Sequence, residues 1–172
     1  DAEAAVMELQ EVDFTQLVRE SVDYVHPSQD RIVELIAPTE PVMVLVDPRR
    51  IQRIIRNLVT NAIDHRGDKS VVVKIEGTNN EVAVGVRDFG DGLTEEDSKR
   101  VFDRFWRKDP ARTRTRGSSG LGLSIAKEDA ELHHGELEVW SRPSQGANFV
   151  LTIPRNPGGV IQSKPLSVIP EI

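Results

Sequence analysis

The chain has 172 residues, of which 38% are hydrophobic and 29% charged, and this composition fits a single domain with its own core. Its net charge of −6 argues against nonspecific attraction to nucleic acid, and the lack of cysteine excludes disulfides and thiolate chemistry. No apolar run approaches the roughly 18 residues of a membrane span, and residues 1–20 lack the layout of a signal peptide, so we expect a soluble chain.

Short strands and helices alternate in the first part of the chain. Residues 1–10 have a helix-forming composition and are interpreted as the last turns of a helix. Residues 11–14 predict a strand, residues 15–25 a helix, and residues 32–36 and 42–46 two strands separated by a Pro-Thr-Glu-Pro turn. Asp47 and Pro48 then form an N-cap and a first helical position, and the helix that follows carries one regular apolar stripe.

The second part of the chain predicts a hairpin, two helices and two further strands. Residues 71–76 and 82–87 are β-branched runs joined by a Gly-Thr-Asn-Asn turn. Residues 156–172 are rich in proline and glycine without any period, which predicts a flexible tail after a domain of about residues 11–155. The helices are expected over residues 94–102 and 121–133, and the strands over residues 137–140 and 149–153.

Polar side chains gather on one flank of the long helix. Asn57, Asn61 and Asp64 fall together at the border of its apolar stripe, as the 100° turn per residue requires. Asparagine oxygens are neutral hard ligands, which suit Mg²⁺ beside a triphosphate. An asparagine pair is also common on a solvated helix face, so by itself the pair is a weak indication of a metal or phosphate site.

An Asp-Phe-Gly-Asp-Gly sequence, residues 88–92, closes the second hairpin strand. The Asp88 carboxylate could accept a hydrogen bond from the 6-amino group of adenine, and it would repel the 6-oxo group of guanine. The alternative is an ordinary Asp-Gly turn. Further on, the glycine-rich residues 117–123 precede a helix, and helix N-termini attract phosphate, although a plain loop before a helix is the alternative.

Positive charge is concentrated between these two stretches. Residues 100–116 contain seven basic and two acidic residues inside an acidic chain, so we expect a compact anion to bind there.

Taken in order, these signals resemble the N, G1, F, G2 and G3 boxes of sensor histidine kinase ATP-binding domains. The resemblance covers nearly all of residues 13–154. It implies a Bergerat (GHKL) fold, as in gyrase B, Hsp90 and MutL: an α/β two-layer sandwich in which a mixed sheet carries about three helices on one face. The matching tracts are Asn57-Leu-Val-Thr-Asn61-Ala62, Asp88-Phe-Gly90-Asp-Gly92, Phe102-Asp-Arg104-Phe-Trp-Arg107, Gly120-Leu121-Gly122-Leu123 and Gly146-Ala-Asn-Phe149.

The resemblance implies ATP and Mg²⁺ as cofactors and assigns roles to the residues of the boxes. Asn61 would coordinate magnesium between the phosphates with the help of Asn57, and Asp88 would hold adenine. Gly90 and Gly92 would give the purine room.

Residues 103–119 would form a lid over the nucleotide. Arg104 and Arg107 would neutralise charge on the transferring phosphoryl group, which is the main task in this chemistry. The phosphates would meet the N-terminus of the following helix at Gly120, Leu121, Gly122 and Leu123.

The chain departs from the family pattern after the second asparagine. The family usually has lysine three residues later, where this chain has Asp64, and a negative charge there should weaken phosphate binding unless a cation compensates. His65, at a position that is often aromatic in the family, is expected to pack near the nucleotide.

None of the four histidines has the setting of the family's phosphoacceptor histidine. We therefore expect the catalytic domain of a receptor kinase, monomeric in isolation, with residues 1–10 a remnant of the preceding dimerisation helix. Its partners would be that dimerisation domain and a response regulator, on the cytoplasmic side of a plasma-membrane receptor with its membrane segments elsewhere. A hydrolytic ATPase of the same fold, with glutamate in place of Asn57, and a non-catalytic nucleotide-binding module, favoured by Asp64, are the alternatives.

Overall fold

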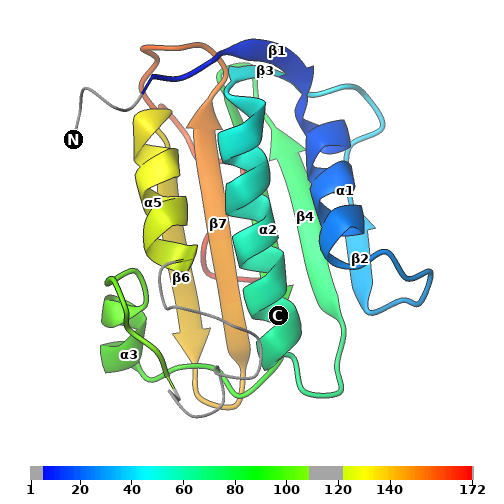
Figure 1. The fold of residues 1–172 in the computed structure, drawn as a ribbon, viewed down its shortest axis with the longest axis vertical. Coiled ribbons are helices and arrows are strands. Elements are labelled where there is room, and N and C mark those ends of the chain that lie inside the picture. Colours follow the sequence, from blue (N-terminus) through cyan, green and yellow to red (C-terminus); the bar gives the residue numbers. More distant parts are fainter. Residues whose placement is uncertain (1–5, 109–121, 172) are drawn as a thin grey trace.

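A computed structural model describes residues 6–108 and 122–171 and shows helices packed on one face of a sheet (Figure 1). The helices are α1 (Phe14–Val25), α2 (Pro48–His65), α3 (Glu95–Arg100) and α5 (Gly122–Leu132). The strands are β1 (Gln10–Asp13), β2 (Val33–Ile36), β3 (Met43–Val46), β4 (Val71–Gly77), β5 (Glu81–Asp88), β6 (Glu136–Arg142) and β7 (Gly146–Pro154). In the described residues, no helix combines the length and apolar character needed to cross a bilayer.

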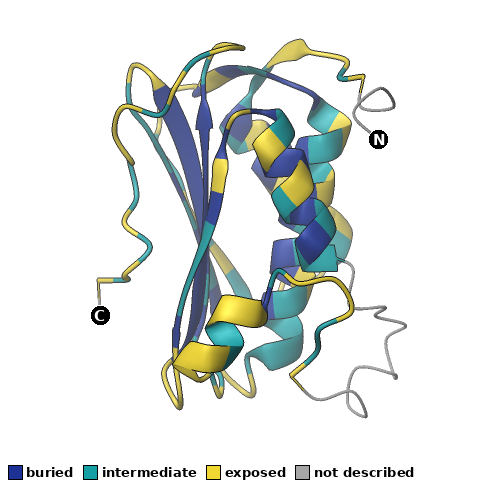
Figure 2. Ribbon diagram, turned by 90° about the vertical axis from the view of Figure 1, so that its left-hand side faces the viewer, coloured by how far each residue is buried: buried dark blue, intermediate teal, exposed yellow. Residues whose placement is uncertain are grey.

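The main sheet is mixed and has the strand order β2-β4-β5-β7-β6. β2 pairs with β4 in parallel, and the other neighbours are antiparallel. β1 and β3 form a separate antiparallel pair at the end of the domain where β7 finishes (Figure 1). α1, α2 and α5 cover one face of the main sheet, which confirms the predicted two-layer sandwich (Figure 2).

The central helix α2 is positioned by its cap and by its apolar stripe. Asp47 caps it by accepting hydrogen bonds from the backbone N–H groups of Arg49 and Arg50, and Pro48 occupies the first turn, as the sequence predicts. Burying one isoleucine side chain of the stripe contributes about 1.5–3 kcal/mol, so the stripe holds α2 firmly against the sheet. The buried members are Ile51, Ile54, Ile55, Leu58, Val59 and Ala62.

The two ends of the chain differ from the sequence-based expectations. Residues 6–9 are not helical and Gln10 begins β1, so the helix expected over residues 1–10 does not reach the described part of that range. The physical reason is that this segment is held by the domain itself: the backbone N–H of Glu8 donates to the Asp47 carboxylate at 3.1 Å, and β1 pairs with β3. At the other end, residues 156–171 contain no helix or strand, yet they contact the sheet.

A buried ionic cluster joins α2 to α5. The Asp129 carboxylate is 1% exposed and accepts hydrogen bonds from Arg50 Nη1 at 2.9 Å and from Arg53 Nε at 2.8 Å. His133, one turn further along the chain, accepts a hydrogen bond at Nε2 from the backbone N–H of Asp47 and donates from Nδ1 to the Asp129 carbonyl oxygen. Burial lowers the pKa of His133, which is consistent with this neutral tautomer.

Replacing Asp129 with alanine should lower the free energy of unfolding by about 3 kcal/mol, because two arginines lose the buried carboxylate that orients them. The matched control is Glu128→Ala, since Glu128 pairs with Arg104 while both side chains are more than half exposed. An exposed pair contributes less than about 1 kcal/mol. Urea unfolding of both variants measures the difference, and equal losses would contradict the assignment of the cluster as a structural link.

Candidate functional site

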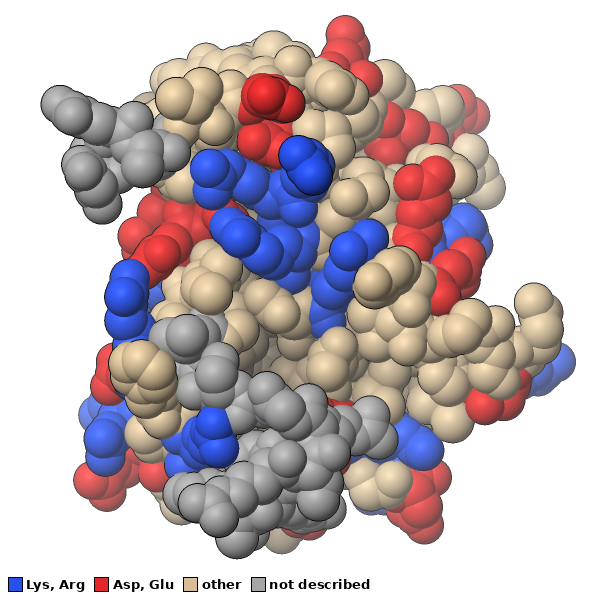
Figure 3. Space-filling model, viewed as in Figure 1, with Lys and Arg blue, Asp and Glu red and all other residues tan. Residues whose placement is uncertain are grey.

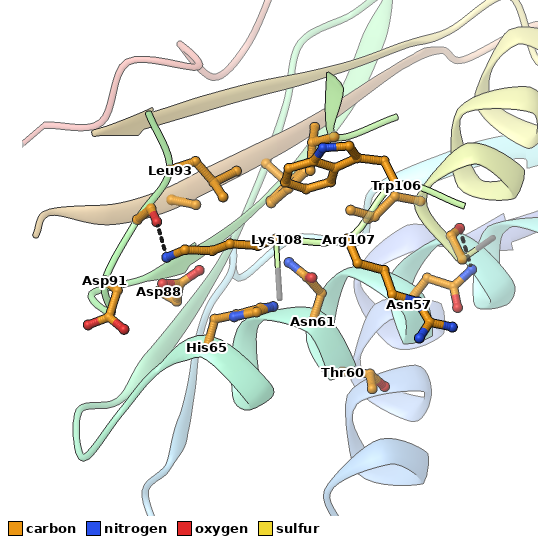
Figure 4. A pocket seen from close by; sticks show the side chains of 16 residues that line it. Asn57, Thr60, Asn61, His65, Asp88, Asp91, Leu93, Trp106, Arg107 and Lys108 are labelled. Carbon is orange, nitrogen blue, oxygen red and sulfur yellow. Dashed lines mark hydrogen bonds between the residues drawn. The ribbon is translucent and has the colours of Figure 1, made fainter. Parts of the chain in front are cut away.

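A pocket opens where the C-terminal half of α2 faces the end of β5 and the start of α5 (Figure 4). Asn57 and Asn61 lie in its wall together with Asp88, which is far from them in the chain. The wall is formed by Asn57, Thr60, Asn61, His65, Asp88, Asp91, Gly92, Leu93, Val101, Trp106, Arg107, Lys108, Gly122, Leu123, Ala147 and Phe149.

Three polar side chains reach the pocket from successive turns of α2. Asn57, Asn61 and His65 are four residues apart, so they share one flank of the helix, and Figure 4 shows Asn61 and His65 pointing into the space beneath Trp106. Asn57 also donates from Nδ2 to the carbonyl oxygen of Gly122 at 2.9 Å. This bond ties α2 to the first residue of α5 and leaves the amide oxygen of Asn57 as the atom able to accept or ligate.

Asp88, the last residue of β5, places its carboxylate at the other end of the pocket. Its side chain is 2% exposed, and Oδ1 accepts a hydrogen bond from the backbone N–H of Gly90 at 3.0 Å. Burial raises the pKa of Asp88 to about 6, against the opposing effects of the Gly90 hydrogen bond and the nearby positive charges of Arg87 and Lys108. A buried carboxylate with a raised pKa in a pocket is typical of a ligand-binding group.

The raised pKa predicts how Asp88 affects stability. Between pH 3.8 and about 6 the folded domain holds the proton more tightly than the unfolded chain, so the Asp88 contribution to stability falls as pH rises through this window. Above it, the ionised side chain costs up to about 3 kcal/mol. Asp88→Asn removes this cost, so the variant should exceed the wild type in stability at pH 7.5 by more than at pH 4.5. Urea unfolding without ligand measures both differences, and a constant gap would contradict the prediction.

Arg87 holds the backbone behind this carboxylate. Its Nη1 donates to the carbonyl oxygens of Asp88 at 2.6 Å and of Gln145 at 2.8 Å, so it joins the end of β5 to the turn between β6 and β7. Its guanidinium also stacks over the Phe89 ring at 4.3 Å. Arg87 could not be identified from the sequence, because nothing local to it indicates these partners.

The glycines of the loop after β5 are required by the protein's own backbone. A side chain at Gly90 would place Cβ 1.6 Å from the carbonyl oxygen of His65. Gly92 has φ +71° and a Cβ there would lie 1.9 Å from the carbonyl oxygen of Arg142. Gly92 lines the pocket and Gly90 does not. Both glycines therefore let the loop pack against α2 and β6, which is a different reason from the room for a purine that the resemblance implies.

The pocket wall opposite α2 contains residues that the sequence analysis did not select as site residues. The Lys108 side chain extends across the pocket and its Nζ donates to the carbonyl oxygen of Gly92 at 2.6 Å (Figure 4). Leu93 and Trp106 supply an apolar surface beside it. The concentration of basic residues in 100–116 indicated an anion site near Lys108, but it did not distinguish this lysine from the six other basic residues of the stretch.

The two arginines expected to act together lie in different surroundings. Arg107 lines the pocket, whereas Arg104 is 67% exposed, does not line it, and pairs with Glu128 of α5 at 2.7 Å. Asp64 lies on α2 outside the pocket wall. Gly122 and Leu123 line the pocket at the start of α5, while Gly120 and Leu121 lie outside the described residues.

The donor set of the pocket suits a cation only if the ligand brings negative charge. The described residues contain no group of three or more His, Cys, Asp or Glu side chains that could hold a metal ion by themselves. Asn57 and Asn61 offer neutral oxygens, and Mg²⁺ commonly takes one or two protein ligands and the rest from phosphate and water. The residues present therefore fit a magnesium ion that enters with a phosphate ligand.

A second basic surface lies on α2, outside the pocket. Figure 3 shows blue side chains gathered over the N-terminal half of this helix, which carries Arg49, Arg50, Arg53 and Arg56. Arg50 and Arg53 bind Asp129, and the Arg56 guanidinium lies 3.7 Å from the centre of the Tyr24 ring. Three of these four arginines, Arg50, Arg53 and Arg56, thus have partners within the domain, unlike a surface kept for a ligand.

Residues 46–157 match the family model described as histidine kinase-, DNA gyrase B-, and HSP90-like ATPase. Among curated proteins, the chain is similar to the sensor histidine kinase MtrB of Mycobacterium leprae and of Mycobacterium tuberculosis, at 43% identity over 99% of this chain. Two tracts of the sequence, residues 56–65 and 101–112, resemble this kinase in particular, and the similarity over the whole chain confirms that resemblance. The chain spans 31% and 30% of the length of these two relatives.

Solved structures give the same result. The catalytic domain of histidine kinase ThkA superposes with a TM-score of 0.73 at 27% identity, covering 88% of this chain and 98% of that domain. The mycobacterial sensor histidine kinase MprB gives a TM-score of 0.71 at 25% identity, covering 87% of this chain and 99% of the other.

Proposed function

Because the chain belongs to the histidine kinase-, DNA gyrase B-, and HSP90-like ATPase family and corresponds to the catalytic domain of sensor histidine kinases, we propose that it binds Mg-ATP and transfers the γ-phosphoryl group to a histidine on a separate dimerisation domain. Nucleotide binding follows from the family; magnesium, the acceptor and the residue roles are parts of the proposal. The observation that carries it is one pocket with the buried Asp88 carboxylate at one end and two asparagines with Arg107 at the other.

The adenine end of the proposed site is Asp88. The carboxylate accepts hydrogen bonds from the backbone of Gly90, at Oδ1, and of Ala147, and its remaining lone pairs can accept a hydrogen bond from the 6-amino group. Leu93, Trp106 and Phe149 line the same pocket and offer apolar surface to a flat ring. His65 would pack beside the nucleotide from α2.

The phosphate end is formed by Asn57, Asn61 and Arg107, whereas the Lys108 ammonium lies at the Gly92 carbonyl oxygen near Asp88. Asn61, with Asn57 assisting, would hold the magnesium ion that the phosphates bring with them. When bound, this ion would neutralise charge between the phosphate oxygens. Gly122 and Leu123 would present the start of α5 to the phosphates.

Arg107 is the better placed of the two arginines for catalysis. In the proposed transfer, the unprotonated nitrogen of a neutral histidine side chain bonds to the γ-phosphorus as the bond to the bridging oxygen of ADP breaks, and the other ring nitrogen releases its proton to solvent. Positive side chains stabilise the charge on the transferring group. Arg107 lines the pocket, while Arg104 would have to leave Glu128 to reach the same place.

We further propose that residues 11–155 form the catalytic domain and that residues 1–10 connect it to the dimerisation domain. In the whole protein, this domain would lie on the cytoplasmic side of a membrane receptor and pass its phosphoryl group through the histidine to a response regulator. The support for this arrangement is the length of MtrB, of which the chain spans 31%.

The direct test is incubation of the chain with γ-labelled ATP and magnesium, with and without a separately produced dimerisation domain of a similar sensor kinase. Label should appear on the dimerisation domain only when both proteins are present, and Asn61→Ala and Asp88→Asn should strongly reduce it. Steady release of free phosphate by the chain alone would instead support a hydrolytic ATPase, which Asn57 disfavours because an amide cannot act as a general base. ATP binding without transfer to any acceptor would support a non-catalytic module.

Asp64→Lys should leave ATP affinity undiminished and the fold intact, because Asp64 lies outside the pocket wall. A positive charge on this flank of α2 can only help to hold phosphate. Calorimetric titration with Mg-ATP measures the effect, and circular dichroism checks the fold. A large loss of affinity would mean that Asp64 supports the metal ion or its waters.

A further inference from the structure

The face of the sheet opposite the helices is covered by the chain's own C-terminal segment. Figure 2 shows this segment running along the outer side of the sheet, away from α1, α2 and α5. We call residues 160–171 the strap. It contains no helix or strand, and no described residue of the strap takes part in the backbone pairing of the sheet.

The strand beneath the strap is anchored to it by a buried carboxylate. Glu81, the first residue of β5, is 0% exposed. It accepts hydrogen bonds from the backbone N–H of Gln162 at 2.9 Å and from the Ser163 hydroxyl at 3.2 Å, besides one from Thr78 within the hairpin. The Gln162 bond is the main reason that the pKa of Glu81 lies below its ordinary value. Carboxylates are almost never fully buried without such partners, so these hydrogen bonds stabilise the ionised form of Glu81 beneath the strap.

Further contacts continue along the strap in one direction. Lys164 Nζ lies 2.8 Å from Glu136 Oε2 and 3.1 Å from Glu138 Oε2, both on β6. The Leu166 side chain sits above Gly85, where a Cβ would be 3.6 Å from its Cδ1. Along its length the strap thus presents to the sheet first hydrogen-bond donors to Glu81, then the cation Lys164, and then the apolar side chain of Leu166.

Near the end of the strap, Asn148 of β7 donates from Nδ2 to the Val168 carbonyl oxygen at 2.9 Å. The strap therefore follows β5 from its first residue toward the end that carries Asp88, since Asn148 is paired with Arg87.

The burial pattern of the central strands shows what the strap covers. Alternate residues of a strand point to opposite faces, so a sheet with one face in water shows alternating burial. All nine residues of β7 are buried, including Val150 and Thr152, which point to the face opposite the helices and are each 0% exposed. Ala83 of β5 points to the same face and is also 0% exposed. Without the strap, an apolar patch and a buried carboxylate would face water.

We propose that the outer face of β5, β7 and β6 is a docking surface for an extended peptide and that its occupant is the strap, bound in cis as a detachable ligand. The sheet contributes side chains and no backbone ladder to the contact, so the strap can leave without breaking a strand pair. Gly158 and Gly159 precede it and give the connection the freedom to do so.

Two variants of the full chain test the proposal, with hydrogen exchange of the strap amides as the readout. Ser163→Asp sets a second carboxylate against Glu81, so exchange in residues 160–171 should rise at least about tenfold while exchange in β5 and β7 stays slow. Ser167→Asp is the matched control, because the Ser167 side chain is exposed and, among the described residues, accepts a hydrogen bond only from the Ile169 N–H within the strap.

A labelled synthetic peptide of residues 160–172 provides the second readout, measured by fluorescence anisotropy without nucleotide. It should bind the Ser163→Asp chain, in which the face is vacated, and not the wild type or the Ser167→Asp chain. Equal exchange and equal lack of binding in all three chains would overturn the proposal. Dimerisation of the wild-type chain in sedimentation, with exchange protection lost on dilution, would overturn the cis assignment and give the face to the strap of a second copy.

Discussion

Replacing Asp88 with asparagine is expected to weaken ATP binding by about 10- to 150-fold, which corresponds to the 1.5–3 kcal/mol of a charge-assisted hydrogen bond. Asparagine keeps the oxygen that accepts from the Gly90 N–H. Its amide nitrogen then takes the position of the second oxygen and meets the 6-amino group of adenine as donor against donor. Calorimetric titration of the wild type and the variant with Mg-ATP measures the loss.

The matched control for this change is Asp91→Asn. Asp91 lines the same pocket and carries the same charge, but its side chain is exposed. Its replacement should change ATP affinity less than about threefold, because exposed charges are screened. A second check is selectivity: Asp88→Asn should reduce the preference for ATP over GTP, since asparagine can donate to the 6-oxo group of guanine. Similar losses in both variants would show that net charge, and not the adenine contact, holds the nucleotide.

Replacing Asn61 with alanine is expected to lower phosphoryl transfer to a supplied dimerisation domain on the order of 100-fold. Asn61 lies in the middle of the pocket wall on α2, between Asn57 and His65, where its amide oxygen can ligate magnesium. Loss of this ligand removes a metal contact and part of the charge compensation of the phosphates. The rate of label transfer at saturating ATP measures the effect.

The control for the Asn61 variant is Thr60→Ala, because Thr60 is exposed at the edge of the same pocket. This neighbour should retain transfer within about twofold. The informative comparison is ATP binding with and without magnesium: magnesium should strengthen binding by the wild type and by Thr60→Ala, and much less by Asn61→Ala. An unchanged magnesium dependence in Asn61→Ala would assign the metal to other ligands and leave Asn61 a structural role.

The helices and strands could be located from the sequence because their signals are local. The apolar stripe from Ile51 to Ala62 and the cap at Asp47 together specify α2, and the structure gives Pro48–His65. The β-branched runs of the hairpin specify β4 and β5 in the same way. The helix expected over residues 1–10 shows the limit of such signals, since its composition favours a helix but Gln10 pairs with Val46.

The candidate site was predictable where a residue type serves the chemistry directly. Asn57, Asn61 and Asp88 all line one pocket, as the pattern of boxes indicates. Lys108 and Arg87 were missed because their importance comes from partners remote in the chain, the carbonyl oxygens of Gly92 and Gln145. For the same reason, the sequence could not separate Arg107 in the pocket from Arg104 on Glu128.

By itself, the sequence determined most of the secondary structure and the asparagines and Asp88 of the pocket, because capping, periodicity and side-chain chemistry are properties of short stretches. The tertiary structure alone decided that β3 pairs with β1 while β2 pairs with β4, and that β7 lies between β5 and β6. It also decided that Glu81 is buried beneath the strap. These outcomes depend on which distant segments satisfy one another's hydrogen bonds and exclude water, and no short stretch carries that information.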